Sequence, residues 1–233
     1  MTSRDWIQNL NCRGILPKEV KDFSKEGAKM HKGFCNYLFK YKTKNDIKTK
    51  YERIVTTLEE IYTCTKPGFD NIGGFSLHVT GHSLGGAIAQ ILAFTLAGSN
   101  LKFLPEGEPV RAITYASPEC GDSGYVASCI ELEKAGKLRH IRVTNQGDAV
   151  PIAFHLPPFS TFEQPGVNIH VYEDQKALVE YNKVKMFFFN PFKALDRHMP
   201  LDYRKHLFDV DENKDLVNSS TREFYEKYAK TEW

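Results

Sequence analysis

Residues Gly81-His82-Ser83-Leu84-Gly85 place a serine between two glycines, directly after the apolar segment 75–80. A chain that turns sharply from a strand into a helix presents a serine hydroxyl in this way. We expect a side chain two residues before or after the serine to collide with neighbouring backbone, so glycine, which has no Cβ, is predicted to be required at Gly81 and Gly85. The stretch therefore predicts a nucleophile elbow with Ser83 as the reactive group.

Both flanks of the elbow fit a strand that turns into a helix. Leu77 and Val79 lie in a segment that follows the turn signal Gly73-Gly74 and is typical of a buried strand. Residues 86–96 are almost wholly apolar, which predicts a helix that ends at Gly98. The alternative is a glycine-rich turn with an incidental serine, and these flanks disfavour it.

Length and composition indicate one main domain without a global charge bias. The chain has 233 residues, 41% of them hydrophobic, and its 31 Lys and Arg nearly balance 29 Asp and Glu, which excludes the basic field typical of a nucleic-acid-binding protein. No secretory signal opens the sequence, and no segment reaches the roughly 18 apolar residues of a membrane span, so we expect a chain that is soluble as written. Residues 186–189 are interpreted as core, with a wall for an acyl chain as the alternative.

A lysine-rich stretch precedes a predicted helix. The lysines are Lys40, Lys42, Lys44, Lys48 and Lys50. The apolar residues expected on the core face of the helix are Ile47, Tyr51, Ile54, Leu58 and Ile61. We favour a hydrated helix entrance over attraction to an anionic lipid surface.

Neither the cysteines nor the acidic residues form a recognisable metal motif. The five cysteines, an odd number at irregular spacing without a C-x-x-C pair, are Cys12, Cys35, Cys64, Cys120 and Cys129. At least one is therefore free or paired between chains. The acidic run that begins at Asp209 fails as a calcium loop, because Lys214 stands where glycine is required and Ser220 where a bidentate Glu belongs.

A serine hydroxyl needs a histidine to accept its proton and a carboxylate to orient that histidine. In serine hydrolases built on a parallel sheet the acid and then the base follow the serine in the chain. Residues 139–144 alternate as a strand does, and Asp148 lies in the turn at its carboxyl end. Asp148 is therefore the candidate acid, and a turn aspartate that binds nearby backbone amides is the alternative.

Four segments are similar to the class 3 (fungal-type) lipase family, which is triacylglycerol lipase-like. Residues 31–34 resemble its H-x-G-F segment, residues 79–87 its V-T-G-H-S-L-G-G-A core, residues 114–118 its strand that ends in a proline, and residues 145–151 its N-x-x-D-x-V-P stretch. The resemblance covers most of residues 5–205. It implies an α/β-hydrolase fold with a mostly parallel sheet and helices on both faces, and it supports Asp148 as the acid.

The same resemblance selects the base from eight histidines. His198 is favoured because residues 197–203 resemble the terminal H-x-x-x-x-Y stretch of the family. It follows Asp148 by 50 residues. The rival candidates are His206 and His155. His82, inside the elbow, is interpreted as structural.

The oxyanion of an acyl-transfer intermediate needs at least two hydrogen-bond donors, and the backbone N–H of Leu84 supplies one. In class 3 lipases the second comes from a Ser or Thr shortly before a D-W or N-W pair, which Asp5-Trp6 resembles. Counting back places that residue one position before Met1. We therefore expect Met1 to be an internal methionine of a longer protein whose first strands are missing here, with Thr2 as an imperfect substitute.

The resemblance also implies a lid over residues 3–20. Its apolar residues are Trp6, Ile7, Leu10, Ile15 and Leu16. A plain surface helix is the alternative. Residues 1–210 are predicted to form the α/β-hydrolase domain, and residues 211–233 a charged helical extension docked by Phe224, Tyr225 and Tyr228.

The function implied is hydrolysis of a lipid ester through Ser83, Asp148 and His198, a mechanism that calls for neither a cofactor nor a metal. The expected partner is a lipid ester substrate, with transient contact to a lipid surface and no nucleic acid. Two alternatives stay open. One is a catalytically silent lipase-like module that binds a lipid or a protein, and the other is a thioesterase or peptidase, because a triad does not specify its acyl substrate. Oligomeric state and localisation do not follow from the sequence.

Overall fold

The computed structural model describes residues 13–41, 43, 45–69, 75–99, 101–153, 161–181 and 194–228. A five-stranded sheet forms its centre, in the order β3 (His78–His82), β4 (Val110–Tyr115), β5 (Leu138–Asn145), β6 (Val167–Val171) and β7 (Leu178–Tyr181). The first four of these strands are parallel, and β7 pairs antiparallel with β6. The mostly parallel sheet agrees with the prediction.

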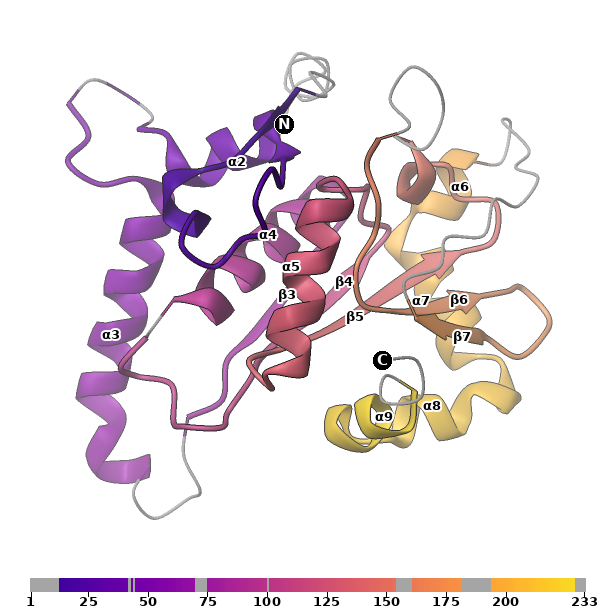
Figure 1. Cartoon of the computed structure of the whole chain (residues 1–233). Helices are drawn as coiled ribbons and strands as arrows, with labels where there is room; N and C mark the ends of the chain where they lie inside the picture. The colour runs from indigo at the N-terminus through magenta and orange to yellow at the C-terminus, as the bar shows by residue number, and fades with distance from the viewer. Residues whose placement is uncertain are drawn as a thin grey trace.

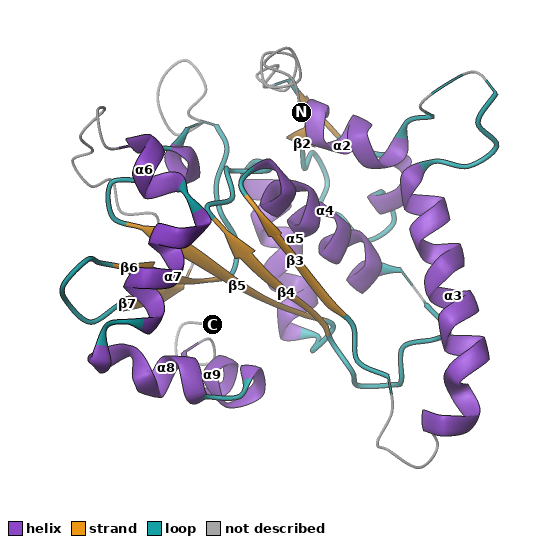
Figure 2. Cartoon of the chain, turned by 180° about the vertical axis from the view of Figure 1, so that it is seen from behind, coloured by secondary structure: helices purple, strands orange, loops and turns teal. Residues whose placement is uncertain are grey.

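Helices cover both faces of this sheet (Figures 1 and 2). The helices α4 (Leu84–Gly98) and α5 (Ser123–Lys134) lie on one face, and α7 (Pro200–Phe208) lies on the other. Side chains of β4 alternate between the two faces, so Val110 and Ala112 pack in the cluster under α4 while Ile113 and Tyr115 pack in the cluster under α7. The sheet is thus buried on both sides, as expected for parallel strands.

The predicted helix after the elbow is α4, and it ends at Gly98 as the sequence indicates. Its residues Ile91, Phe94 and Leu96 are at most 1% exposed. Burial of each such side chain stabilises the fold by about 2 kcal/mol. The strand before the elbow is less buried than expected, and its Val79 is half-buried. The reason is that β3 is the edge strand among the described strands.

Smaller elements pack around the edge of the sheet. The strands β1 (Gly14–Ile15) and β2 (Met30–His31) form an antiparallel pair, and a single 3-10 turn, η1 (Lys18–Val20), lies between them. The region expected to form a lid therefore includes a strand, and Ile15 packs against the core. Some predicted features lie outside the described residues, namely the other expected lid residues up to position 12, His155 and residues 186–189.

Two helices follow this strand pair, α2 (Lys32–Phe39) and α3 (Lys50–Phe69). A reciprocal cap starts α3, because the Thr49 hydroxyl accepts from the Glu52 N–H at 3.2 Å and the Glu52 carboxylate accepts from the Thr49 N–H at 2.6 Å. Ile47 precedes this cap and is 90% exposed, and Ile61 is 46% exposed, so the predicted core face was wrong at both positions. The residues of α3 that face the core are Tyr51, Val55, Leu58 and Tyr62.

Short helices form the last described part of the chain. These are α6 (Ala194–His198), the 3-10 turn η3 (Asp211–Asn213), α8 (Lys214–Asn218) and α9 (Thr221–Tyr228), with α7 between α6 and η3. Phe224, which is 3% exposed, and Tyr228 pack into the hydrophobic cluster under α7, so these two aromatic side chains dock α9, whereas the side chain of Tyr225 lies outside the description. The division of the chain at residue 210 stays a prediction.

Within the described ranges, no helix has the length and apolar character needed to cross a membrane, and no three His, Cys, Asp or Glu side chains gather as metal ligands. The cysteines of these ranges are free thiols. Cys35, Cys120 and Cys129 are buried and Cys64 is exposed, whereas Cys12 lies outside the description. Burial raises the pKa of the Cys35 thiol to about 12, which keeps it protonated and unreactive.

A buried histidine makes the fold sensitive to acid. His140 of β5 is 2% exposed, with its Nε2 at 3.1 Å from the Thr114 hydroxyl. Burial, and next the neighbouring Arg142, lower the pKa of His140 to about 3. The unfolded chain takes up a proton below about pH 6.5 and the folded chain does not, so stability falls as pH drops from 6.5 towards 3.

We predict that His140→Gln reduces the acid sensitivity of the fold. The loss of unfolding free energy between pH 7 and pH 5, measured by urea denaturation, should be smaller in this variant by about 2 kcal/mol, because glutamine can still contact Thr114 but does not titrate. His78→Gln, at an exposed histidine of the edge strand, is the matched control; partial burial lowers the pKa of His78 as well, but less than that of His140, so this variant should reduce the wild-type difference by less. Equal acid sensitivity in His140→Gln and the wild type would contradict the assignment.

Candidate active site

Ser83 lies at the turn between β3 and α4 in the left-handed region, with φ of 57° and ψ of −129°. Few residues with a side chain adopt this conformation, and it persists only where surrounding contacts enforce it. One such contact is the hydrogen bond that the Ser83 N–H donates to the Tyr115 carbonyl at 2.9 Å. The backbone at the end of β4 thus holds the turn, as the predicted elbow requires.

The glycines around Ser83 differ in how strictly they are needed. A Cβ on Gly81 would lie 2.3 Å from the carbonyl oxygen of Gly85, a distance that no structure tolerates. A Cβ on Gly85 would meet nothing within 4 Å among the described residues, whereas one on Gly86 would lie 3.0 Å from the Cβ of Ser117. The predicted requirement for glycine at Gly85 was therefore wrong, and the second tight position is Gly86.

The structure brings Ser83, His198 and Asp148 into one hydrogen-bonded line. The Ser83 Oγ lies 2.8 Å from His198 Nε2. His198 Nδ1 lies 2.9 Å from one carboxylate oxygen of Asp148 and 3.2 Å from the other. This is the order of contacts by which a carboxylate orients an imidazole toward a serine.

The Asp148 carboxylate is fully enclosed and held by further donors. Its side chain has 0% exposure. Tyr203 donates its hydroxyl to Oδ2 at 2.7 Å, and the Val150 N–H donates to Oδ1 at 2.9 Å. Burial, and next the Asp148 charge, raise the pKa of Tyr203 well above its ordinary value, so the hydroxyl stays a donor. In the sequence, Tyr203 was recognised only as the last residue of the H-x-x-x-x-Y pattern, and no role was predicted for it.

His82 contacts the backbone of the segment that carries His198. Its Nε2 lies 2.8 Å from the His198 carbonyl oxygen, so the nitrogen carries a proton that it donates. Burial lowers the pKa of His82, which favours the neutral ring. The structural interpretation of His82 agrees with this geometry, and the contact ties the elbow to the α6 segment.

A second polar cluster holds the residue before His198. Asn145, at the end of β5, donates its side-chain amide to the Arg197 carbonyl at 2.9 Å and to Asp202 at 2.8 Å. The Arg197 guanidinium pairs with the carboxylates of Glu173 and Asp202. His206 completes the cluster, with Nδ1 at 2.7 Å from the side-chain amide oxygen (Oδ1) of Asn145. His206 therefore serves this cluster and does not contact Ser83.

Of the expected oxyanion donors, the structure describes Leu84. It is the first residue of α4, where backbone N–H groups have no acceptor within the helix. The positive end of the helix dipole also lies here, and both effects favour a negative charge next to Ser83. Thr2 and Asp5-Trp6 lie outside the described residues.

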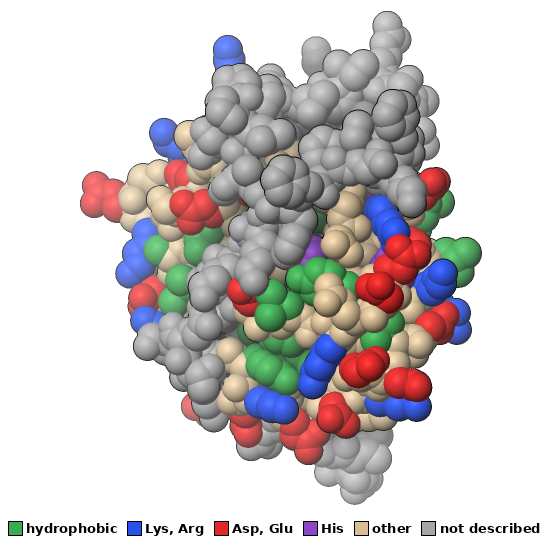
Figure 3. Space-filling model, turned by 90° about the vertical axis from the view of Figure 1, so that its right-hand side faces the viewer, with side chains coloured by type: hydrophobic (Ala, Val, Ile, Leu, Met, Phe, Trp, Pro, Cys, Tyr) green, Lys and Arg blue, Asp and Glu red, His purple; other side chains and the backbone are tan. Residues whose placement is uncertain are grey.

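Hydrophobic side chains lie next to a point where histidine reaches the surface (Figure 3). Met199 and Leu201, on either side of the start of α7, are 55% and 73% exposed, while the His198 side chain is 13% exposed. His198 is thus reachable from an apolar part of the surface. This arrangement suits a substrate with an apolar acyl group.

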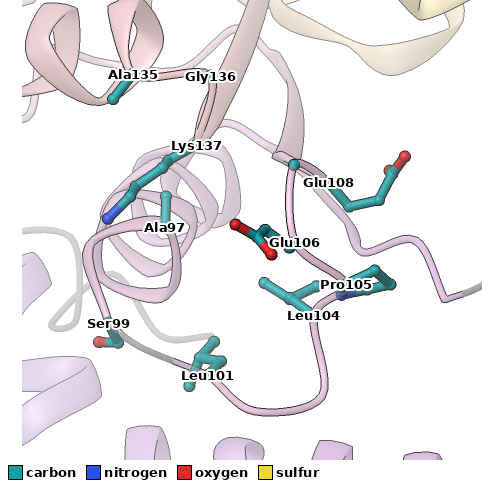
Figure 4. A pocket seen from close by; sticks show the side chains of 11 residues that line it. Ala97, Ser99, Leu101, Leu104, Pro105, Glu106, Glu108, Ala135, Gly136 and Lys137 are labelled. Atoms are coloured by element: carbon teal, nitrogen blue, oxygen red, sulfur yellow. The ribbon is translucent and has the colours of Figure 1, made fainter.

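A separate cavity of about 480 Å³ lies at the other end of α4, lined by residues that include Ser99, Leu101, Glu106 and Lys137 (Figure 4). The 15 residues of α4 lie between the cavity and Ser83. At 1.5 Å per residue this helix is roughly 22 Å long. It contains none of the predicted site residues. We assign it no part in the chemistry of Ser83.

A mostly parallel sheet with a serine at the turn from β3 into α4 defines an α/β hydrolase. The Lipase (class 3) family profile matches residues 1–158, and the chain belongs to that family. Its fold is similar to that of lipase II from Rhizopus niveus, with a TM-score of 0.55 at 23% identity over 84% of this chain and 64% of that one.

Plant phospholipases are similar to it in sequence. Phospholipase A1-II 6 of Oryza sativa subsp. japonica is 28% identical over 67% of this chain and 39% of its own length. Phospholipase A1-II 4 of the same subspecies is 32% identical over 72% of this chain and 40% of its own length. The chain thus spans about two fifths of the length of these relatives.

We predict that Gly81→Ala destabilises the protein by about 3 kcal/mol, because its Cβ would collide with the Gly85 backbone. Gly85→Ala is the matched control and should be neutral or slightly stabilising, since alanine favours a helix over glycine. Urea denaturation of both variants measures the difference. A large loss in Gly85→Ala would refute the asymmetry between the two glycines.

We predict that Tyr203→Phe lowers kcat about tenfold, because the Asp148 carboxylate loses a charge-assisted hydrogen bond that helps to fix its position. The buried Asn145 N–H also loses its acceptor, the Tyr203 hydroxyl at 3.1 Å, which costs about 1–3 kcal/mol of stability. Hydrolysis of p-nitrophenyl butyrate measures kcat.

Tyr51→Phe is the matched control, because it removes a hydroxyl that contacts Ser99 at the far end of α4. It should leave kcat unchanged. If the two variants lose the same share of kcat, the hydroxyl of Tyr203 has no specific effect on the site.

Proposed function

We propose that this protein hydrolyses lipid esters with Ser83 as nucleophile, His198 as general base and Asp148 as the group that orients His198. The observation that carries the proposal is the contact between the Ser83 hydroxyl and His198 Nε2 at 2.8 Å, with His198 Nδ1 at 2.9 Å from Asp148. Membership of the class 3 lipase family supports a lipid ester as the substrate.

The reaction has two acyl-transfer steps. Ser83 Oγ attacks the ester carbonyl carbon while its proton passes to His198 Nε2, and the alcohol then leaves with that proton, so the acyl group stays on Ser83. A water molecule attacks the acyl-enzyme, gives its proton to His198 and releases the carboxylic acid as Ser83 regains its hydroxyl proton.

Four groups supply the preorganisation that these steps need. Asp148 holds the proton of the imidazole on Nδ1, which leaves Nε2 free to accept the Ser83 proton. Tyr203 and Val150 donate to the two oxygens of Asp148, so the carboxylate cannot rotate away. The Leu84 N–H stabilises the oxyanion, a contribution that is typically worth about 3 kcal/mol for one donor.

We propose a glycerophospholipid as the substrate, with a carboxylic ester of its acyl chain as the bond that is cut. The relatives named phospholipase A1 support this choice over a triacylglycerol. The exposed Met199 and Leu201 beside His198 provide apolar contact area for an acyl chain.

The first test is hydrolysis of phosphatidylcholine and of tributyrin by the purified chain beside Ser83→Ala. Release of fatty acid that disappears with Ser83→Ala supports the proposed nucleophile, and faster release from phosphatidylcholine supports the proposed substrate. Activity that persists in Ser83→Ala would reject Ser83. A folded wild type inactive on both substrates would reject hydrolysis by this chain in favour of a silent lipid- or protein-binding module.

We predict that Asp148→Asn lowers kcat by a factor of about 10⁴, because an amide placed against Nδ1 favours the tautomer whose Nε2 cannot accept the Ser83 proton. The substrate in this assay is p-nitrophenyl butyrate. Asp209→Asn changes an exposed aspartate after α7 in the same way and should keep full activity. A loss of less than tenfold in Asp148→Asn would remove Asp148 from the proposed triad.

A further inference from the structure

The loop between α2 and α3 exposes basic and apolar side chains next to one another. Ile47 is 90% exposed and Tyr41 is 53% exposed. Lys40 and Lys48 are exposed as well. A single exposed aliphatic side chain is ordinary on a protein surface, so Ile47 is informative only through its place beside exposed lysines, a combination that suits a charged lipid surface.

The loop keeps a strong positive charge. Residues 40–50 contain five lysines and one acid, Asp46. The Asp46 carboxylate accepts from the Thr43 N–H at 2.7 Å and pairs with Arg53 at 2.9 Å. The hydrogen bond from Thr43, and secondarily the Arg53 charge, lower the pKa of Asp46, so its charge is already matched within the loop.

The start of α3 does not require these lysines. Thr49 and Glu52 cap the helix reciprocally. Lysines at the amino end of a helix are unfavourable toward the helix dipole, which attracts negative charge there. The cap of α3 therefore does not account for the positive charge of the loop.

The position of the loop relates it to the proposed active site. Figures 1 and 2 place the connection between α2 and α3 on the upper side of the molecule, at the opposite lateral edge from α6, which lies on the same upper side and ends at His198. Met199 and Leu201, 55% and 73% exposed, follow α6 directly. A flat surface against the upper side would meet the loop and extend toward the segment that carries His198.

We propose that residues 40–48, the basic loop, dock the protein on a lipid surface with anionic headgroups. Lys40 and Lys48 neutralise headgroup phosphates, and Tyr41 and Ile47 enter the boundary between the headgroups and the acyl chains. Charge complementarity selects an anionic partner. Two features favour a lipid over an acidic protein: the exposed aliphatic Ile47, and the position of the loop on the same upper side as α6. The substrate proposed for this lipase-family chain is itself a lipid of such a surface.

The test is cosedimentation with vesicles, performed throughout in Ser83→Ala so that no lipid is hydrolysed by the proposed nucleophile. Vesicles of phosphatidylcholine alone are compared with vesicles that contain one part phosphatidylglycerol to two parts phosphatidylcholine. Binding to the anionic vesicles should fall with added salt. The double charge reversal Lys40→Glu with Lys48→Glu should lower the partition coefficient by roughly 25-fold or more.

Two matched variants control for net charge and for exposed apolar area. Lys102→Glu with Lys227→Glu makes the same change in charge at exposed lysines after α4 and in α9 and should bind as before. Ile47→Ser should weaken binding, whereas Phe208→Ser, at a side chain 52% exposed at the end of α7, should not. Circular dichroism checks that each variant is folded.

The outcomes separate the lipid surface from other partners. Salt-sensitive binding to anionic vesicles that only the changes in the basic loop weaken supports the proposal. Equal binding to both kinds of vesicle, or an equal loss in the two double variants, would overturn it. Absence of binding to any vesicle would also overturn it and would favour an acidic protein as the partner. Because binding is measured without turnover, neither result depends on whether Ser83 is the nucleophile.

Discussion

The site depends on the close approach of two pieces of backbone where β3 crosses into α4. Gly81 and the Gly85 carbonyl leave no room for a Cβ between them, and Gly86 lies against Ser117. This contact forces Ser83 into the left-handed region, with φ of 57°, so that its side chain points away from both the strand and the helix. The strain is local and small next to the burial of the α4 face, whose apolar side chains each contribute about 2 kcal/mol.

The segment that carries His198 is held from two neighbouring parts of the sheet edge. α6 has only five residues, too few for a helix to be stable by itself. Its last carbonyl accepts from His82, at the end of β3, and the carbonyl of Arg197 accepts from Asn145, at the end of β5. Two backbone carbonyls in succession are therefore fixed by side chains of different strands. These two contacts fix the position of the His198 imidazole relative to Ser83.

Sequence could predict the features that are local or belong to a motif. The elbow and α4 follow from glycine placement and a continuous apolar run, and the turn with Asp148 follows from the alternation in β5. The choice of His198 over His206 needed family resemblance, because both are histidines near a helix and only tertiary contacts separate them. Ile47 was assigned to the core because the period of three or four residues continues through it. The cap at Thr49, a local feature, makes the helix begin only after Ile47. Asn145 was visible only as the first letter of a motif.

The hydrogen bonds among Asn145, Arg197 and His206 fit together with one placement of the His206 proton. Asn145 donates its amide to the Arg197 carbonyl, so its oxygen must accept, and the proton of His206 must therefore lie on Nδ1. His206 Nε2 is then an acceptor, which the Arg197 guanidinium satisfies at 2.9 Å. A second proton on His206 would place an N–H against that guanidinium and break the contact. Burial lowers the pKa of His206 and the Arg197 charge lowers it further, while Asp202 opposes them, so the neutral ring is favoured. The same choice of tautomer fixes the Asn145 amide, the Arg197 carbonyl and, one residue later, the backbone of His198.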